Sequence, residues 1–360
     1  MMARSQAKQV DVAIGANVSR ASVSAVMNGT RPVSPQLRRR VLQAMQDLGY
    51  EPDAIARGLR LRRTYTIGML AANIFSPFWP AVVRGAEDRA REHHYSLLFL
   101  STDEEVSRHS LGIRIMLGRR VDGLILAPTA EIDEPLMSQL EASGLPVVLV
   151  DRKIEGSKFG SVTVDNENAA YRAVMHLIEG GRKRIACLSI PTTVTTGRDR
   201  VAGFRRACAD AGLSADAALI RYVSLTVADG FSQASELLRA RPRPDAIFAT
   251  NHSATIAALE AFRAFGVVVP DEVALVGFDD QPWLALMHPP VTAVSQPTYE
   301  FGRQAVEQVM RLIDDAESGP VDTVMATSFV DRETCGCRRP IGANLAKRSP
   351  TAEPALEETH

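Results

Sequence analysis

Apolar positions divide the chain into a short N-terminal part with helical spacing and a long part in which strand-like and helical stretches alternate. In the first fifty residues the helical spacing runs through three stretches, 11–16, 19–28 and 35–48. In the middle stretch, Val23, Val26 and Met27 form one apolar stripe that can pack on neighbouring helices. The sequence therefore predicts a small domain of three helices.

Residues suited to helix ends stand at the edges of these stretches. Ser19 and the pair Ser34-Pro35 are typical of a first helical turn, because the serine hydroxyl accepts a free backbone N–H. Asn28-Gly29 and Gly49 tolerate the left-handed conformation that ends a helix. Asn17 tolerates the positive φ that the turn of a helix-turn-helix requires.

The face of the middle helix opposite the apolar stripe carries Arg20, Ala21, Ser24 and Ala25, of which only the arginine is long. A slim polar face on a short helix can enter the major groove of DNA. We therefore expect Arg20, Ala21 and Ser24 to read bases. We expect Ser19, Ser22 and the backbone amides near helix starts to contact phosphates. The complete predicted surface of this helix is Ser19, Arg20, Ala21, Ser22, Ser24, Ala25 and Asn28.

From residue 64 onward, short apolar runs alternate with helical stretches, a pattern typical of a parallel sheet with helices on both faces. The predicted strands are 65–71, 96–101, 121–127, 146–150, 161–164, 184–189, 219–222, 246–249, 274–277 and 323–330. The predicted helices are 82–94, 110–117, 134–142, 166–179, 198–211, 230–240, 254–265 and 301–316. Two such series, the second beginning at 161, indicate an α/β core of two similar lobes with a cleft between them.

These patterns give a predicted domain organisation. The chain begins with a helix-turn-helix headpiece, 1–50, and a short joint, 51–63. The core, 64–339, contains an N-lobe of about 64–160 and 291–320 and a C-lobe of about 161–290 and 321–339. The polar residues 340–360, rich in Pro, Ala and Glu, are expected to be a disordered tail.

Charge is distributed unevenly between these parts. Residues 1–63 hold eleven Arg and Lys but four Asp and Glu, a charge of +7, while the rest of the chain carries −8 and the total is −1. A basic head on an acidic body is typical of a phosphate-binding module joined to a soluble sensor. A solvated helical face without a partner is the alternative.

Composition favours an ordinary soluble protein, with 46% hydrophobic and 23% charged residues. The sequence shows neither a membrane-spanning apolar run nor a signal peptide, so we expect a cytoplasmic protein. Of the four cysteines, Cys335 and Cys337 flank a glycine and could bind a metal or form a redox pair. Since no second cluster accompanies them, we expect reduced thiols without a role, and no metal or cofactor.

The N-terminal part resembles the headpiece of the lactose-repressor family of bacterial transcription regulators. The matching residues are Asp11-Val12-Ala13, Val18-Ser19, Val23-Ser24, Asn28-Gly29, Val33-Ser34, Arg40-Val41, Leu48-Gly49-Tyr50, Pro52 and Ala56-Arg57-Gly58-Leu59. The chain departs from the family at Lys8, Asn17 and Ala25, where Thr, Gly and Arg are usual. Loss of that arginine predicts an operator that differs from the family norm.

The resemblance also assigns a role to the joint. It implies a hinge helix that orders when two copies pack on DNA, with Leu59 as an apolar wedge in the minor groove and Ala56 and Arg57 beside it. Isolated helices this short are marginal in water. A plain linker is the alternative interpretation.

Over 64 to about 339 the chain resembles the lobe pair of type I periplasmic binding proteins. Ligands of open α/β sheets bind at the carboxyl ends of strands, where this chain carries aromatic, acidic and amide side chains. The family's Arg-x-Arg-x-x-Gly-Phe pattern implies that Arg198 enters the cleft and that Arg200 is a structural charge. For Phe78 the alternative is a position in the lobe core. For Asp151 the alternative is an ordinary surface position. The expected effector-binding residues are Phe75, Ser76, Phe78, Trp79, Thr129, Asp151, Arg198, Asn251, Asp279 and Gln296.

Together these features predict a ligand-responsive transcriptional repressor. We expect a homodimer, with a tetramer also open, on near-palindromic double-stranded operator DNA, and a sugar or sugar derivative as effector. Whether the effector releases or tightens DNA stays open. A sugar-binding transport receptor is one alternative, against which the basic headpiece and the missing signal peptide stand. An enzyme using Asp151, Arg198 and Asp279 for acid–base work is another, but no nucleophile–base pair accompanies them.

Overall fold

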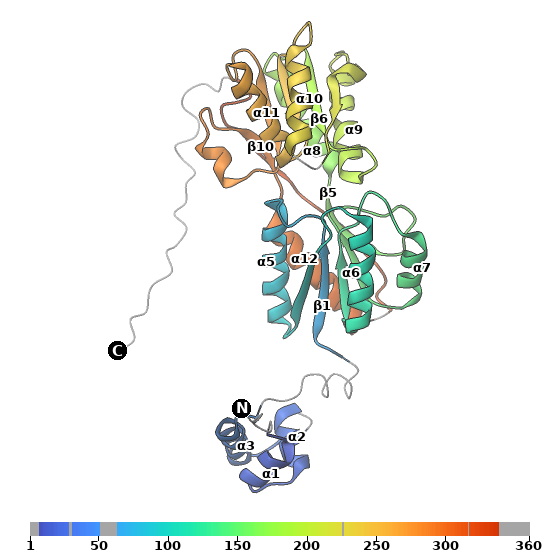
Figure 1. Cartoon of the computed structure of the whole chain (residues 1–360), viewed down its shortest axis with the longest axis vertical. Helices are drawn as coiled ribbons and strands as arrows, with labels where there is room; N and C mark the ends of the chain where they lie inside the picture. Colours follow the sequence, from blue (N-terminus) through green and yellow to red (C-terminus); the bar gives the residue numbers. More distant parts are fainter. Residues whose placement is uncertain (1–6, 29–30, 51–62, 225–226, 316, 338–360) are drawn as a thin grey trace, which may run out of the picture. The chain divides into compact units, whose positions relative to one another are not determined.

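The computed structural model describes residues 7–28, 31–50, 63–224, 227–315 and 317–337 (Figure 1). These described residues form two compact units, one within 1–66 together with 120–122 and the other within the remainder of the chain. The predicted tail and nearly all of the predicted joint lie outside the described residues. Among the described residues, no helix combines the length and apolar character needed to span a membrane.

The headpiece consists of α1 (Gln9–Gly15), α2 (Arg20–Asn28) and α3 (Pro35–Leu48), as the apolar spacing predicts. Val12, Val23 and Val41, one from each helix, are fully buried at its centre. Removing these side chains from water is what stabilises helices too short to persist alone.

Local bonds at the helix ends confirm the predicted caps. Ser19 Oγ accepts the backbone N–H of Ser22 at 3.1 Å, and Ser34 Oγ accepts that of Leu37 at 3.3 Å. Asn17 has φ 50°, and Gly49 ends α3 with φ 59°. At Lys8, which cannot accept such a bond with its side chain, the Asp11 carboxylate instead accepts the Lys8 backbone N–H at 2.8 Å.

The larger unit has two lobes, each built on a six-stranded sheet. The first sheet has the order β11-β5-β4-β3-β1-β2, and the second has the order β12-β10-β9-β8-β6-β7. The first contains β1 (Thr66–Ala71), β2 (Ser96–Ser101), β3 (Gly123–Leu126), β4 (Val147–Val150), β5 (Gly160–Val164) and β11 (Asp322–Met325). The second contains β6 (Ile185–Ser189), β7 (Ile220–Tyr222), β8 (Ala246–Ala249), β9 (Ala274–Phe278), β10 (Thr292–Ser295) and β12 (Ser328–Val330).

Helices surround each sheet (Figure 1). Those of the first lobe are α5 (Phe78–Glu92), α6 (Val106–Arg119), α7 (Glu134–Ala142) and α12 (Thr298–Asp314). Those of the second are α8 (Asn166–Glu179), α9 (Thr195–Asp210), α10 (Val227–Arg239) and α11 (His252–Phe265), with short 3₁₀ turns η1 (Ala217–Leu219) and η2 (Pro282–Leu286). The central strands are buried along their whole length, as expected for parallel sheets covered on both faces.

The register pairs are parallel except for β10 with β12, which is antiparallel. The prediction of an α/β core with parallel sheets is therefore confirmed. Strand β10 was missed, because only four residues, Thr-Ala-Val-Ser, follow a stretch broken by two prolines.

The predicted lobe boundaries are wrong at three strands. We expected 161–164 and 321–339 in the C-lobe and 291–320 in the N-lobe, but β5 and β11 belong to the first sheet and β10 to the second. The predicted strand 323–330 is in fact two strands, β11 and β12, one in each sheet. The reason is long-range pairing: β5 lies against β4 without an intervening helix, and β11 pairs with β5. The chain therefore crosses between lobes after β5, after β10 and after β11.

Two glycines allow α5 and α12 to lie against one another in the first lobe. A Cβ at Gly302 would lie 1.9 Å from the carbonyl oxygen of Val82, and one at Gly85 would lie 1.9 Å from that of Tyr299. Since real Cβ atoms never approach so closely, this backbone contact depends on both glycines.

Candidate ligand cavity and nucleic-acid interface

A cavity of about 60 Å³ lies between the two lobes at the carboxyl ends of strands from both sheets. Seven of the ten predicted effector-binding residues line it: Ser76, Phe78, Trp79, Asp151, Asn251, Asp279 and Gln296. It is also lined by eight residues outside that prediction: Asn73, Glu104, Arg152, Ile190, Thr196, Arg200, His252 and Ser253. The topology brings together side chains from the ends of β1, β2, β4, β6, β8, β9 and β10, as expected for open α/β sheets.

Arg200 is the cation that the second lobe presents to this cavity. It is 3% exposed, donates from Nε to Asn166 Oδ1 at 2.8 Å and from a terminal nitrogen to the Thr250 carbonyl at 2.6 Å. Its guanidinium lies over the ring of Phe278. Burial lowers the pKa of Arg200, and the charges of Asp279 and Asp151 oppose that shift. The side chain is held rigidly, so its remaining donor edge is oriented in advance of binding.

Arg198, the expected ligand residue, does not line the cavity. Its side chain is 48% exposed and forms ion pairs with Glu155 and with Asp199, the latter at 3.0 Å. Both arginines lie on α9, and two successive helical steps of about 100° place them on opposite sides of that helix. Arg200 therefore lines this cavity, while Arg198 lines a neighbouring pocket that also includes Asp151.

Asp279 and Gln296 line the cavity and are hydrogen-bonded to one another. Gln296 donates from Nε2 to Asp279 Oδ1 at 2.6 Å, and the His252 backbone N–H donates to Asp279 Oδ2 at 3.3 Å. Gln296 Oε1 is buried and has no hydrogen-bond partner within the described part of the chain. A buried acceptor of this kind is costly unless a ligand hydroxyl or a water donates to it.

Asp151 and Asp279 follow strands β4 and β9 and both have positive φ, 69° and 76°. Aspartate tolerates this left-handed backbone better than most residues, so each carboxylate can stand directly at a strand end. Burial raises the pKa of Asp151, while the neighbouring Arg152 and Arg200 charges act to lower it. Arg152 is itself fixed by a two-pronged pair with Glu104, both contacts at 2.7 Å.

Phe78 and Trp79 form the aromatic side of the cavity. Their rings meet edge to face with centroids 5.0 Å apart, and Phe78 also contacts Phe301 at 5.6 Å. Both residues are almost fully buried. Phe78 therefore packs in the lobe core and also lines the cavity.

His252 connects the two lobes at the edge of the cavity. Its Nδ1 lies 3.4 Å from Ser76 Oγ of the first lobe, and its Nε2 lies 3.1 Å from Ser253 Oγ. Asn251, the preceding residue, caps α11 by accepting the Ala254 N–H at 2.8 Å, so its side-chain oxygen already has a structural role.

Phe75 and Thr129 lie outside the cavity. Phe75 is 86% exposed, in the turn before α5. Thr129 is buried, but its hydroxyl donates to the Glu131 carbonyl at 2.6 Å. Each follows a strand in the sequence, which is why it was expected in the cavity. Phe75 instead lies exposed, and Thr129 bonds within its own turn.

The headpiece presents α2 as the predicted nucleic-acid interface. Ser19, Arg20 and Ala21 are exposed, and Ser22 and Ser24 are half-buried. Ala25 is 2% exposed, so the expectation that it belongs to the exposed face is wrong: its methyl group is small enough to be covered completely. The side chain of Asn28, and the hinge residues Ala56, Arg57 and Leu59, lie outside the described residues.

A potential metal-binding group, separate from the cavity, consists of His176, Cys335 and Cys337 in the second lobe. Neither the cysteine pair nor the histidine lines the cavity between the lobes.

Two family models match the chain. Residues 64–333 match the one described as periplasmic binding proteins and sugar binding domain of LacI family. Residues 10–53 match the one described as bacterial regulatory proteins, lacI family. Both resemblances drawn from the sequence are thereby confirmed.

Curated relatives cover most of the chain, and those named here are transcriptional regulators. The transcriptional repressor PurR of Photobacterium profundum is 33% identical over 85% of this chain and 91% of its own. The transcriptional regulator CelR of Thermobifida fusca is 33% identical over 90% of this chain and 96% of its own.

Solved structures share the architecture. The transcriptional regulator CelR–cellobiose complex has a TM-score of 0.71 and 31% identity, covering 91% of this chain and 100% of that chain. The lac repressor dimer bound to operator and the anti-inducer ONPF has a TM-score of 0.83 over 92% of this chain and 99% of that chain. At 23% identity, the second likeness shows the fold alone.

Proposed function

This chain belongs to the lacI family of bacterial regulatory proteins, and from that premise we propose that it is a repressor whose affinity for a near-palindromic operator is set by a carbohydrate bound between its lobes. Its family makes it a DNA-binding transcriptional regulator with a ligand-binding domain. Beyond that role, we infer that the protein represses transcription, responds to a carbohydrate, binds DNA as a dimer and acts in the cytoplasm.

The observation that carries the proposal is the set of groups around the cavity. Arg200 offers donors, Asp151 and Asp279 offer acceptors, and Trp79 and Phe78 form an aromatic side. Vicinal hydroxyls that donate and accept in turn satisfy such a set, and a sugar ring also presents C–H faces for the aromatics. The CelR relative solved with cellobiose supports the same class of ligand.

The small volume of the cavity suggests how effector binding is coupled to DNA binding. Its volume of about 60 Å³ is well below the ~150 Å³ of a protein cavity that holds benzene. A monosaccharide is larger than benzene, so its entry has to separate groups that now touch, including Ser76 and His252. When one lobe moves against the other in each protomer of a dimer, the two first lobes hold their headpieces in a different arrangement. A coupling of about 1–3 kcal/mol, or 5- to 150-fold in affinity, is typical of such linkage.

On DNA, we assign base contacts to Arg20, Ala21 and Ser24 and phosphate contacts to Ser19 and Ser22. The exposure of Arg20 and Ala21 supports the first part, and the position of Ser19 at the start of α2 supports the second. Two copies of α2 related by a two-fold axis would read two half-sites of the operator.

The test uses the full-length protein and a duplex selected from random DNA. Thermal-shift screening of sugars identifies ligands, and fluorescence anisotropy then measures operator affinity with and without each one. We expect a ligand that raises the melting temperature also to change operator affinity about 5- to 150-fold. Absence of sequence preference would overturn the DNA-binding part. A ligand that binds without changing DNA affinity would overturn the coupling, and turnover of the bound ligand would favour an enzyme.

A further inference from the structure

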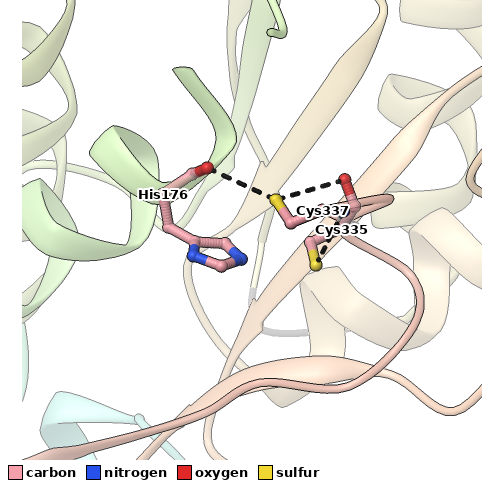
Figure 2. A group of neighbouring side chains, drawn as sticks. All are labelled: His176, Cys335 and Cys337. Atoms are coloured by element: carbon pink, nitrogen blue, oxygen red, sulfur yellow. Dashed lines mark hydrogen bonds between the residues drawn. The ribbon is translucent and has the colours of Figure 1, made fainter. Parts of the chain in front are cut away.

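Three potential metal ligands meet in the second lobe, and one of them, His176, is far from the other two in the sequence. Ligand atoms of His176, Cys335 and Cys337 all lie within 4.8 Å of one another (Figure 2). His176 comes from the last turn of α8, and the two cysteines come from the segment that follows β12. From the sequence, Cys335 and Cys337 could bind a metal or form a redox pair, and we expected neither role because no second cluster accompanies them. The structure brings His176 beside them.

A carboxylate outside this group, that of Asp331, lies against two of its three members, His176 and Cys335. Asp331 Oδ1 lies 3.6 Å from His176 Nε2 and 3.4 Å from Cys335 Sγ. A tetrahedral zinc ion with ordinary Zn–N, Zn–O and Zn–S bonds separates such ligand pairs by about 3.4–3.6 Å. These two ligand-to-ligand distances therefore already match those around a bound zinc ion.

The group is buried and incompletely satisfied. Cys335 is fully buried and Cys337 is half-buried. His176 Nε2 is buried too, and no atom of the described chain hydrogen-bonds to it. The thiols supply the hydrogen bonds that the group has: Cys335 Sγ donates to Asp331 Oδ1 at 3.4 Å, and Cys337 Sγ donates to the His176 carbonyl at 3.5 Å (Figure 2). His176 Nε2 is therefore the buried ligand atom for which a metal ion would replace a missing partner.

The surrounding fold holds these ligands in place. Thr334 Oγ1 donates to the Leu275 carbonyl at 2.8 Å and accepts the Thr292 N–H at 2.9 Å, which fixes the segment to β9 and β10. The Cys337 backbone N–H donates to Cys335 Sγ at 3.4 Å, a contact that stabilises a thiolate. A Cβ at Gly180 would lie 2.5 Å from Cys337 Sγ, so glycine there permits the sulfur to approach α8.

We propose that His176, Cys335 and Cys337, completed by Asp331, bind Zn²⁺ and join the end of α8 to the C-terminal segment of the second lobe. The imidazole and thiolate ligands favour zinc over the hard cations, which prefer oxygen. Binding releases the thiol protons to solvent, because the ligands are thiolates. None of the four residues lines the cavity, so this zinc is structural and independent of the effector.

The test measures zinc in untagged, full-length protein purified under reducing conditions, exposed to buffered zinc and freed of loose metal by desalting. We expect about one zinc per chain in the parent protein. His176→Gln, Cys335→Ser and Cys337→Ser should each lose it. Cys208→Ser is the matched control, because Cys208 is a buried thiol of the same lobe that does not belong to the group, and it should retain the zinc.

A second measurement keeps the proposal falsifiable if those variants fail to fold. Cobalt added to the metal-free parent protein should give the intense visible bands of a tetrahedral site together with thiolate-to-cobalt charge transfer, and chelation should lower the melting temperature. Zinc content equal in all four variants, an octahedral cobalt spectrum, or a Cys335–Cys337 disulfide that persists in protein purified under reducing conditions would each overturn it.

Discussion

The guanidinium carbon of Arg200 lies 3.7 Å from the centre of the Phe278 ring, and Asp279 follows that ring directly in the chain. A buried cation is tolerated where an aromatic face, hydrogen-bond acceptors and carboxylates surround it. Arg200 has all three, and it is the only one of the two neighbouring α9 arginines, Arg198 and Arg200, that reaches the cavity. Arg200 of α9 and Asp279 at the end of β9 are therefore at the centre of the proposed effector site.

Arg200→Lys should therefore weaken effector binding far more than Arg198→Ala. Lysine keeps the charge but loses the planar fork that the site orients, and a charged hydrogen bond contributes about 1.5–3 kcal/mol, or roughly 10- to 100-fold in affinity. Isothermal titration with the effector found by screening measures this. Arg198→Ala, at an exposed position, should change affinity by less than about 0.5 kcal/mol. Equal losses in the two variants would contradict our placement of the ligand.

His109 should make the first lobe sensitive to acid. It lies on α6, 1% exposed, and among the described residues neither ring nitrogen has a hydrogen-bond partner. Burial lowers the pKa of His109 from the ordinary 6.5 to about 4. Between these values the unfolded chain binds the proton and the folded chain does not, so stability falls as pH falls from 6.5 towards 4.

The cost is about 1.4 kcal/mol per pH unit, or about 2 kcal/mol at pH 5. His109→Leu removes the titrating group, so we expect the variant to lose that much less stability than the parent protein between pH 7 and pH 5. Urea unfolding at both pH values, followed by tryptophan fluorescence, checks this. Both tryptophans, Trp79 and Trp283, belong to the larger unit, so the fluorescence does not report on unfolding of the headpiece. Parallel curves for the two proteins would refute the assignment.

Gly302→Ala should destabilise the core strongly. The new methyl group would lie 1.9 Å from the Val82 carbonyl oxygen, which is backbone of a packed helix and cannot rotate away. Overpacking of this kind costs about 1–3 kcal/mol, and a backbone neighbour places it at the upper end. Gly118→Ala is the matched control on α6, because a Cβ there meets nothing within 4 Å. It should stabilise by about 0.5–1 kcal/mol in the same urea experiment. A similar small effect of both changes would show that α5 and α12 do not pack this closely.

Elements with strong local signals were predictable from the sequence. The predicted helices 134–142 and 166–179 coincide with α7 and α8, which begin after aspartates that cap them: Asp133 accepts the Leu136 N–H at 3.1 Å, and Asp165 accepts that of Asn168 at 3.0 Å. Helix α9 begins three residues before its prediction, since Val194 precedes it and offers no side-chain cap.

The long-range features were not predictable in this way. Which lobe holds β5, β10 and β11 depends on pairing between strands far apart in the chain, and apolar spacing carries no information about partners. The same limit explains the effector site. Strand ends could be located from the sequence, so Asp151 and Asp279 were found, but the side of α9 that faces the cavity is set by packing. A sequence motif therefore identified the arginine pair and not the member that lines the cavity.

In the headpiece, Arg20 and Arg40 should separate recognition of DNA from folding. Arg20 is exposed on α2, whereas Arg40 of α3 donates from Nε to the Ala16 carbonyl at 3.1 Å and from a terminal nitrogen to that of Asn17 at 2.7 Å. Arg20→Ala should keep the helical circular dichroism and its melting, yet cost about 1–3 kcal/mol on the selected duplex and relax preference at one base pair in each half-site.

Arg40→Ala should do the reverse, because it removes bonds that hold the turn between α1 and α2. Charged hydrogen bonds of this kind contribute about 1.5–3 kcal/mol each, so we expect the headpiece to melt at a lower temperature. The headpiece that remains folded should keep the parent's base preference, since the side chains of α2 are unchanged. Anisotropy on the selected duplex and on random DNA separates the two effects. If Arg20→Ala weakens both duplexes equally, Arg20 contacts phosphate, and the assignment of base reading to the start of α2 fails.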